Sequence, residues 1–330
     1  MKRPLLAPLV PLYWLGARGK NALFDWDFRH VKRLQCPVIS VGSLSGGGAG
    51  KTPVVLMLAE LLAKRGVAVD VLSRGYGRGA GVAEEVDAAG DAVQFGDEPL
   101  EMARRGVRVF VGADRFEAGT VAEEVSLDPM SQNRDMGHAD LRCHLLDDGF
   151  QHRRLGRDLD LVLLTVEDSR DWLLPGGNLR EPMASLRRAD VVVVREDEAA
   201  ELAGVIPAGA HVWLIRRELV LAADRPAKLF AFCGIARPEG FFRMLPEVAG
   251  LRAFPDHHAY ETADFTGLVA SAKSAGAEGF VTTAKDAVKI SASARRQLEA
   301  VGPVFVAELR VSLVDEEDAW ETLSAACVRR

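Results

Sequence analysis

The chain has 330 residues, of which 48% are hydrophobic and 27% are charged, and its formal net charge is −6. This balance excludes an intrinsically disordered protein, and an acidic chain without a dominant basic face is not expected to bind nucleic acid. The length suits two domains of ordinary size. The four cysteines form no CxxC pair, which argues against a disulfide framework or a zinc knuckle and favours reduced thiols in the cytosol.

Residues 1–28 combine apolar and basic side chains. The apolar ones include Leu5, Leu6, Leu9, Leu12, Tyr13 and Trp14, and residues 1–40 hold seven basic side chains against two acidic ones. The apolar run is too short to span a bilayer, and prolines interrupt it where a signal peptide would be continuous. The composition is typical of a membrane-interface segment. A helix packed on the protein's own core would share it, and this stretch alone favours neither interpretation.

A glycine-rich segment follows a predicted strand at 37–41 and precedes a predicted helix at 53–64. Its residues are Ser45, Gly46, Gly47, Gly48, Ala49, Gly50, Lys51 and Thr52. In such a loop, backbone N–H groups and the N-terminus of the next helix surround a polyphosphate. Lys51 is expected to reach the β- and γ-phosphates, and Thr52 to hold Mg²⁺. The strict pattern has glycine in place of Ser45, but the order of strand, loop and helix predicts an ATP-binding P-loop.

Short β-branched or leucine-rich runs alternate with helical patterns through residues 29–222. They lie at 67–72, 107–111, 143–146, 159–166, 191–194 and 212–215. This alternation predicts a P-loop NTPase-like α/β domain with a doubly wound parallel sheet. Further strand candidates at 228–233, 280–282 and 304–307 predict a second, smaller α/β domain over residues 227–330. The stretch 126–140 is interpreted as a surface insertion.

Acidic residues lie at two places that suit nucleotide chemistry. Asp147 and Asp148 follow the predicted strand at 143–146, and ligands of open α/β sheets bind at the carboxyl ends of strands. Both are therefore candidate Mg²⁺ ligands, together with Thr52, and candidate catalytic residues. Asp97 lies in a Gly-Asp-Glu-Pro segment, where its carboxylate could accept the proton of an acceptor hydroxyl. The same segment also fits a simple turn that opens a helix at Pro99.

Eight motifs in this order resemble those of the tetraacyldisaccharide 4'-kinases. They are GSLSGGGAGKTP at 42–53, SRGYGR at 73–78, GDEP at 96–99, DDGFQHRR at 147–154, PGGNLREP at 175–182, CGIARP at 233–238, FPDHH at 254–258 and TAKD at 283–286. The resemblance covers nearly the whole chain. It implies an enzyme that uses ATP and Mg²⁺ to phosphorylate the 4'-hydroxyl of the lipid A disaccharide 1-phosphate precursor. It also implies peripheral attachment to the cytoplasmic face of the bacterial inner membrane through the N-terminal segment.

The same resemblance implies roles for individual residues. Asp97 corresponds to the aspartate of a catalytic dyad whose histidine is His257, and the adjacent His258 leaves the choice of histidine open. The remaining motifs imply that the acceptor cleft is lined by Arg74, Arg78, Glu98, Arg115, Gln151, His152, Arg180 and Glu181. No obligate protein partner is expected. The alternatives are a P-loop kinase of a soluble metabolite and a nucleotide-dependent membrane adaptor without catalytic activity.

Overall fold

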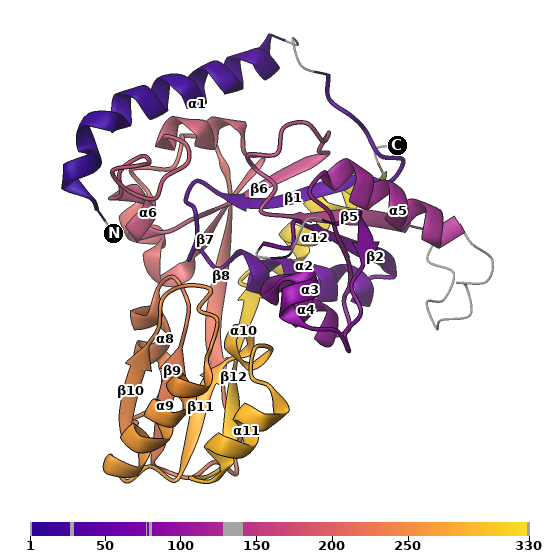
Figure 1. The fold of residues 1–330 in the computed structure, drawn as a ribbon. Coiled ribbons are helices and arrows are strands. Elements are labelled where there is room, and N and C mark those ends of the chain that lie inside the picture. Colours follow the sequence, from indigo (N-terminus) through magenta and orange to yellow (C-terminus); the bar gives the residue numbers. More distant parts are fainter. Residues whose placement is uncertain (1, 27–29, 77, 79–80, 128–140, 329–330) are drawn as a thin grey trace.

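A single twelve-stranded sheet runs through the molecule, and helices cover both of its faces (Figure 1). The computed structural model describes residues 2–26, 30–76, 78, 81–127 and 141–328. Most of the predicted insertion at 126–140 lies outside the described residues. The strands are β1 (Val38–Ser43), β2 (Val67–Ser73), β3 (Glu84–Glu85), β4 (Arg108–Val111), β5 (Leu141–Asp147), β6 (Leu159–Leu164), β7 (Val191–Arg195), β8 (His211–Val220), β9 (Leu229–Cys233), β10 (Gly250–Ala253), β11 (Gly279–Thr283) and β12 (Val304–Leu313).

The helices are mostly short, and the longer ones pack against the sheet or lie at its ends. The α-helices are α1 (Val10–Asp25), α2 (Lys51–Lys64), α3 (Ala92–Phe95), α4 (Asp97–Arg104), α5 (Arg115–Leu127), α6 (Val166–Ser169), α7 (Ala199–Leu202), α8 (Pro238–Met244), α9 (Thr262–Ser274), α10 (Ala284–Ala287), α11 (Ala292–Glu299) and α12 (Glu316–Val328). The 3-10 helices are η1 (Pro4–Leu9), η3 (Met183–Arg188) and η4 (Glu196–Glu198).

The strand order is β10-β9-β11-β12-β8-β7-β6-β1-β5-β2-β4-β3. Neighbouring strands are parallel except for two antiparallel pairs, β12 with β8 and β3 with β4. The predicted α/β class with a mostly parallel sheet is confirmed. The β8–β12 pair, in which Ile215 lies opposite Leu313 and Val220 opposite Glu308, joins the first half of the chain to the second within one sheet.

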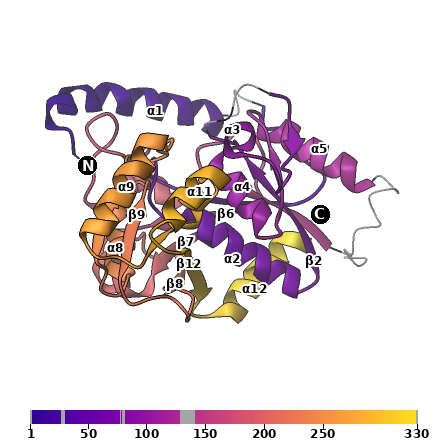
Figure 2. The same cartoon turned by 60° about the horizontal axis from the view of Figure 1, so that its bottom comes forward.

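Each half of the chain has a hydrophobic core of its own. The first core includes residues of the sheet and of helices α2, α3, α4 and α12, and α2 and α12 lie side by side in Figure 2. The second includes Phe230, Phe232 and Phe280, whose rings meet edge to face. Helix α12 belongs to the last part of the chain, yet Ala319 and Leu323 are buried in the first core. The predicted division at residues 222 and 227 thus falls between β8 and β9. The last helix, α12, nevertheless packs in the core of the first half.

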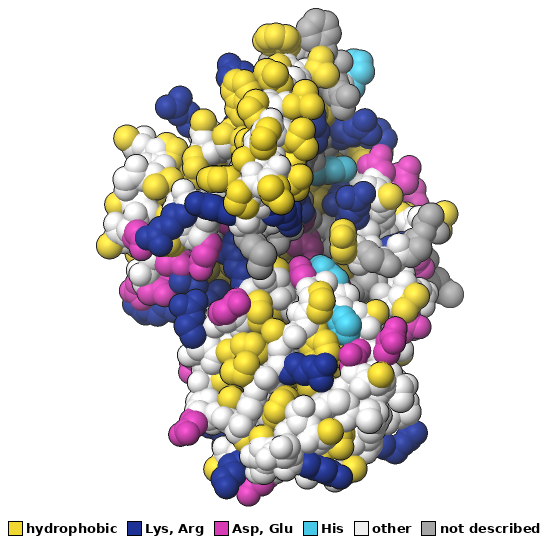
Figure 3. Space-filling view, turned by 60° about the vertical axis from the view of Figure 1, so that its left-hand side comes forward, with side chains coloured by type: hydrophobic (Ala, Val, Ile, Leu, Met, Phe, Trp, Pro, Cys, Tyr) yellow, Lys and Arg dark blue, Asp and Glu magenta, His cyan; other side chains and the backbone are white. Residues whose placement is uncertain are grey.

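Helix α1 leaves much of its apolar surface uncovered. Leu5 in η1 is 96% exposed, Leu12 70% and Trp26 70%, and hydrophobic side chains gather over this end of the molecule in Figure 3. Polar contacts help to hold α1 on the remainder of the protein: the Tyr13 hydroxyl donates to the Arg180 carbonyl, and the Asn21 amide donates to Glu181. Among the described residues, no helix combines the length and the hydropathy needed to cross a bilayer.

Candidate active site

The glycine-rich loop joins the end of β1 to the beginning of α2, so that helix α2 starts at Lys51. Gly48 and Gly50 have φ angles of +76° and +83°, in the left-handed region that glycine adopts without steric cost. The Lys51 Nζ lies 3.4 Å from the Ser43 hydroxyl and 3.3 Å from Asp148 Oδ1. The loop therefore has the backbone, the helix N-terminus and the cation that a bound polyphosphate requires.

Asp147 and Asp148 lie at the carboxyl end of β5, as the sequence predicts. Asp147 accepts a hydrogen bond from the Ser73 hydroxyl (3.0 Å), and Asp148 accepts one from Arg180 Nη1 (2.7 Å). Burial, followed by the charges of Glu98 and Asp148, raises the pKa of Asp147. Burial also acts on Asp148, but the charges of Lys51 and Arg180 outweigh it and lower the pKa of that carboxyl.

These two carboxylates meet the donor requirements of a hard divalent cation. Asp147 Oδ1 is buried and makes no hydrogen bond with the described residues, whereas the buried Asp148 Oδ1 pairs with Lys51 Nζ at 3.3 Å. Buried polar atoms are normally satisfied, and carboxylate oxygens are the ligands that Mg²⁺ prefers. The residues present at the end of β5 therefore fit a magnesium ion beside the glycine-rich loop.

Asp97 and His257 come from opposite halves of the chain and meet at 3.0 Å, between Asp97 Oδ2 and His257 Nδ1. Asp97 is 5% exposed at the start of α4, and Lys289 Nζ lies 3.3 Å from its Oδ2. Burial opposes the charge of Asp97, but the hydrogen bond from His257 and the charge of Lys285 lower its pKa to about 2. The same hydrogen bond raises the pKa of His257 against the effect of burial.

The two adjacent histidines have different partners. His258 Nε2 lies 2.9 Å from Asp264 Oδ2, and the His258 ring stacks on Phe254. His257, by contrast, contacts Asp97 through Nδ1 and receives a hydrogen bond from Lys285 Nζ at Nε2 (3.2 Å). The choice of histidine that the sequence left open thus falls geometrically on His257.

A cavity of about 430 Å³ opens beside the acidic pair. Its lining consists of Lys20, Ser73, Arg74, Tyr76, Glu98, Ala113, Arg115, Asp147, Asp148, Gln151, His152 and Arg180. Six of the eight residues expected in the acceptor cleft are among them. Asp97 and His257 border the cavity without lining it, since Glu98 adjoins Asp97 in the chain and the Tyr76 ring lies 4.9 Å from that of His257.

The other two expected cleft residues make structural contacts elsewhere. Arg78 Nη2 donates to the Val82 carbonyl and to Glu84, which braces the loop between β2 and β3. Glu181 accepts hydrogen bonds from Asn21 and Arg188 and so connects α1 to the body of the protein. Within the cavity, burial and the charge of Arg115 lower the pKa of His152 to about 4, so this imidazole is neutral at physiological pH.

Several residues around the cavity were not expected from the sequence. Lys20 has no motif around it, whereas Tyr76 stands inside the Ser-Arg-Gly-Tyr-Gly-Arg segment and could have been included. Arg237 passes so close to Gly48 that a Cβ at that glycine would lie 2.7 Å from its side chain. The guanidinium of Arg237 in turn pairs with Asp168 at 2.8 Å. The second half of the chain therefore covers the glycine-rich loop.

Comparisons with known proteins agree with this geometry. Residues 2–328 match the family model described as tetraacyldisaccharide-1-P 4'-kinase. Proteins named tetraacyldisaccharide 4'-kinase are similar to the chain in Koribacter versatilis (40% identity, 98% of this chain and 99% of the relative) and Geobacter metallireducens (37%, 94% of each). A crystal structure of LpxK from Aquifex aeolicus in complex with ATP has 31% identity, a TM-score of 0.74 and 98% coverage of both chains. The chain therefore belongs to the tetraacyldisaccharide-1-phosphate 4'-kinase family, the kinases of lipid A biosynthesis.

Proposed function

We propose that Asp97 and His257 together position and deprotonate the 4'-hydroxyl of the tetraacyldisaccharide 1-phosphate while the glycine-rich loop holds ATP. The observation that carries this proposal is the 3.0 Å contact between the two side chains, which 160 residues of sequence separate, at the border of the cavity. The hydrogen bond from the imidazole to the carboxylate fixes the orientation of both groups, and the pair titrates as a unit. The acceptor's proton is therefore assigned to the pair, not to either residue alone.

The charges around the cavity suit transfer of the γ-phosphoryl group. Protein catalysis of this reaction is chiefly positioning of the reactants and stabilisation of charge. Arg180 extends from the acidic pair to the Gly46 carbonyl of the loop (3.1 Å), where it can contact the transferred group. Arg74, Arg115 and Lys20 lie on the cavity wall, which places cations where the acceptor's own phosphate can be bound.

Magnesium fits the same site. Thr52, Asp147 Oδ1 and the Asp148 carboxylate would hold the ion, which would neutralise charge on the β- and γ-phosphate oxygens. Lys51 lies between the loop and Asp148 and holds the carboxylate in its charged form. Ser73 fixes the other oxygen of Asp147 through its hydroxyl. These contacts orient both carboxylates before any nucleotide binds.

We further propose that α1 attaches the enzyme to the cytoplasmic face of the inner membrane. The uncovered residues Leu5, Leu12 and Trp26 form an apolar surface, while Tyr13 and Asn21 bind the body of the protein. An apolar face of this kind inserts at the boundary of headgroups and acyl chains. The acyl chains of the acceptor remain in the bilayer, so a helix on the bilayer brings the cavity to the sugar.

One assay tests the proposed dyad. The protein is incubated with radiolabelled ATP, Mg²⁺ and detergent-dispersed tetraacyldisaccharide 1-phosphate, and labelled lipid is separated from free phosphate. We expect labelled lipid from the parent and from His258→Gln, and a large loss for His257→Gln with ATP affinity retained. If His257→Gln turned over as fast as His258→Gln and the parent, His257 would have no part in the reaction. Label released only as free phosphate would contradict lipid phosphorylation.

A further inference from the structure

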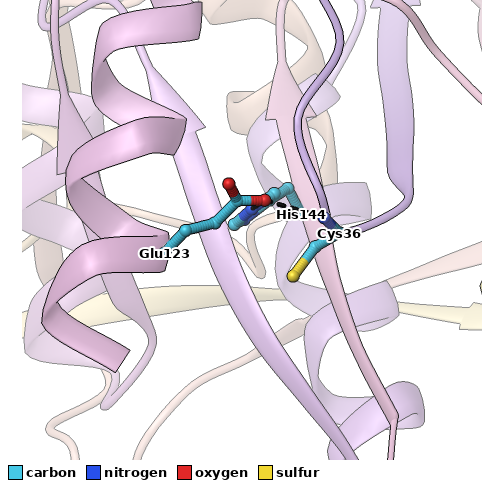
Figure 4. Close-up of side chains that lie close together, drawn as sticks. All are labelled: Cys36, Glu123 and His144. Atoms are coloured by element: carbon cyan, nitrogen blue, oxygen red, sulfur yellow. Dashed lines mark hydrogen bonds and ion pairs between the residues drawn. The ribbon is translucent and has the colours of Figure 1, made fainter. Parts of the chain in front are cut away.

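Three potential metal ligands meet away from the cavity, on the sheet face that α5 covers (Figure 4). They are Cys36 in the segment before β1, Glu123 on α5 and His144 on β5, and their ligand atoms all lie within 4.8 Å of one another. None of them lines the cavity. We propose that Cys36, Glu123 and His144 bind a divalent cation of the zinc type, with the thiolate, one carboxylate oxygen and one imidazole nitrogen as ligands.

The spacing of the ligand atoms is close to that of a tetrahedral site. Bonds of about 2.0–2.1 Å to nitrogen or oxygen and about 2.3 Å to sulfur place neighbouring ligand atoms about 3.3–3.6 Å apart. His144 Nε2 already lies 3.5 Å from Glu123 Oε1. The Cys36 thiol lies within 4.8 Å of a ligand atom of each of these two residues, so a small side-chain movement completes the set. A fourth position is left for water.

The imidazole of His144 is buried between two carboxylates. Its side chain is 0% exposed, and neither ring nitrogen makes a hydrogen bond with the described residues. Its Nε2 faces Glu123 Oε1 at 3.5 Å, longer than an ordinary hydrogen bond. Buried polar groups normally have well-formed partners, and a cation between these two atoms would supply one. The other ring nitrogen, Nδ1, lies 3.7 Å from Asp70 Oδ2. A carboxylate on the far nitrogen is the usual outer partner of a metal-binding histidine.

The surrounding charges permit a cation. Arg108 and Arg142 each pair with Asp70 at 3.1 Å, and Arg108 also pairs with Glu85 at 3.4 Å, so two carboxylates balance these two guanidinium groups. Glu123 Oε1 accepts from the Cys36 backbone N–H, which holds the carboxylate beside the thiol. Burial and the charge of Glu123 raise the pKa of Cys36 to about 11. The thiol is therefore protonated without metal, and coordination forms the metal–sulfur bond as that proton leaves to water.

The ligand types select the metal. Thiolate and imidazole favour zinc and its chemical relatives over magnesium, so this site and the acidic pair at the end of β5 discriminate between cations. Cys36 is only partly buried, which provides an entry route. Because Glu123 lies on α5 and His144 on β5, bound metal would fasten α5 to the strand that ends at Asp147.

Cobalt(II) tests the proposal in the full-length, metal-stripped protein, with excess Mg²⁺ present to fill the hard-oxygen site. We expect one equivalent of cobalt to bind with a thiolate-to-cobalt charge-transfer absorption in the ultraviolet, and zinc to displace it. Cys36→Ser should lose this absorption, whereas the matched control Cys233→Ser, in the second half of the chain, should retain it. Absence of the band in the parent, or its persistence in Cys36→Ser, would overturn the proposal.

A second variant addresses the chance that Cys36→Ser fails to fold. Glu123→Gln keeps an oxygen to accept the Cys36 N–H and removes only the charge. Loss of an outer-sphere partner costs about 10–100-fold in affinity, and loss of a charged ligand should cost at least as much in a zinc titration. Circular dichroism should show the parent fold. Zinc affinity equal to that of the parent would contradict the assigned ligand set.

Discussion

Replacing Asp97 by asparagine removes one charge from a tightly packed group of ions. The amide has the size of the carboxylate, so the fold should persist, but His257, Lys285 and Lys289 all lose their shared anion. A positioned acid–base group contributes about 10²–10⁴-fold to a reaction rate. We therefore expect kcat to fall by this factor, which corresponds to about 2.7–5.4 kcal/mol in the activation barrier.

The pH dependence gives the same variant a second readout. The hydrogen bond to Asp97 is the main cause that raises the pKa of His257 above its ordinary value. The dyad accepts a proton only when His257 is unprotonated, so kcat rises as the pH passes the raised pKa of His257. The midpoint of this acidic limb therefore lies above a pH of about 6.5. In Asp97→Asn that cause disappears, so the limb should move to lower pH.

The assay is lipid phosphorylation from pH 5 to 9, with ATP affinity measured separately by calorimetry. We expect the affinity of Asp97→Asn to change by less than about threefold, because the effect belongs to the chemical step. Asp264→Asn is the matched control, since Asp264 also contacts a histidine, the neighbouring His258, at 2.9 Å from its Nε2. A turnover number of Asp97→Asn within threefold of the parent, with an unmoved limb, would refute the assignment.

Three further predictions concern separate parts of the molecule. Lys51→Ala should weaken ATP binding about tenfold or more in calorimetry, because a charged hydrogen bond to phosphate is lost; unchanged affinity would place the triphosphate elsewhere. Leu9→Glu combined with Leu12→Glu should reduce sedimentation with anionic vesicles at least about tenfold, since each buried leucine contributes about 1.5–3 kcal/mol, while the exposed positions leave circular dichroism unchanged. Phe232→Ala, which empties part of the second core, should lower the free energy of unfolding in urea by about 3–5 kcal/mol, and a loss below about 1 kcal/mol would contradict tight packing there.

The local parts of the site could be predicted from the sequence because their signals are local. A strand, a glycine-rich turn and a helix follow one another within 30 residues, and the structure has them at Val38–Ser43 and Lys51–Lys64. Asp147 and Asp148 likewise follow their strand directly. In each case the chain direction of a parallel strand determines which edge of the sheet its last residues reach.

The other parts depend on contacts between distant segments. Nothing around Lys20 indicates that α1 brings its side chain to the cavity wall. Arg237 belongs to the CGIARP motif, but only the packing of the two halves places it against Gly48. The sequence likewise separates 227–330 as a unit, whereas Leu323 of α12 is buried in the core of the first half, because hydrophobic periodicity identifies a helix but not the surface it covers.

The backbone is strained at two residues of the candidate site. Among the described residues, Asp148 and His257 are the non-glycine positions with positive φ, at +50° and +56°. Such conformations cost about 1–3 kcal/mol each and persist only where surrounding contacts impose them. Asp148 is held by Lys51 and Arg180, and His257 by Asp97 and Lys285. The two strained residues belong to opposite halves, which the β8–β12 pairing joins in one sheet. Asp148 lines the cavity, and His257 lies at its border beside Tyr76.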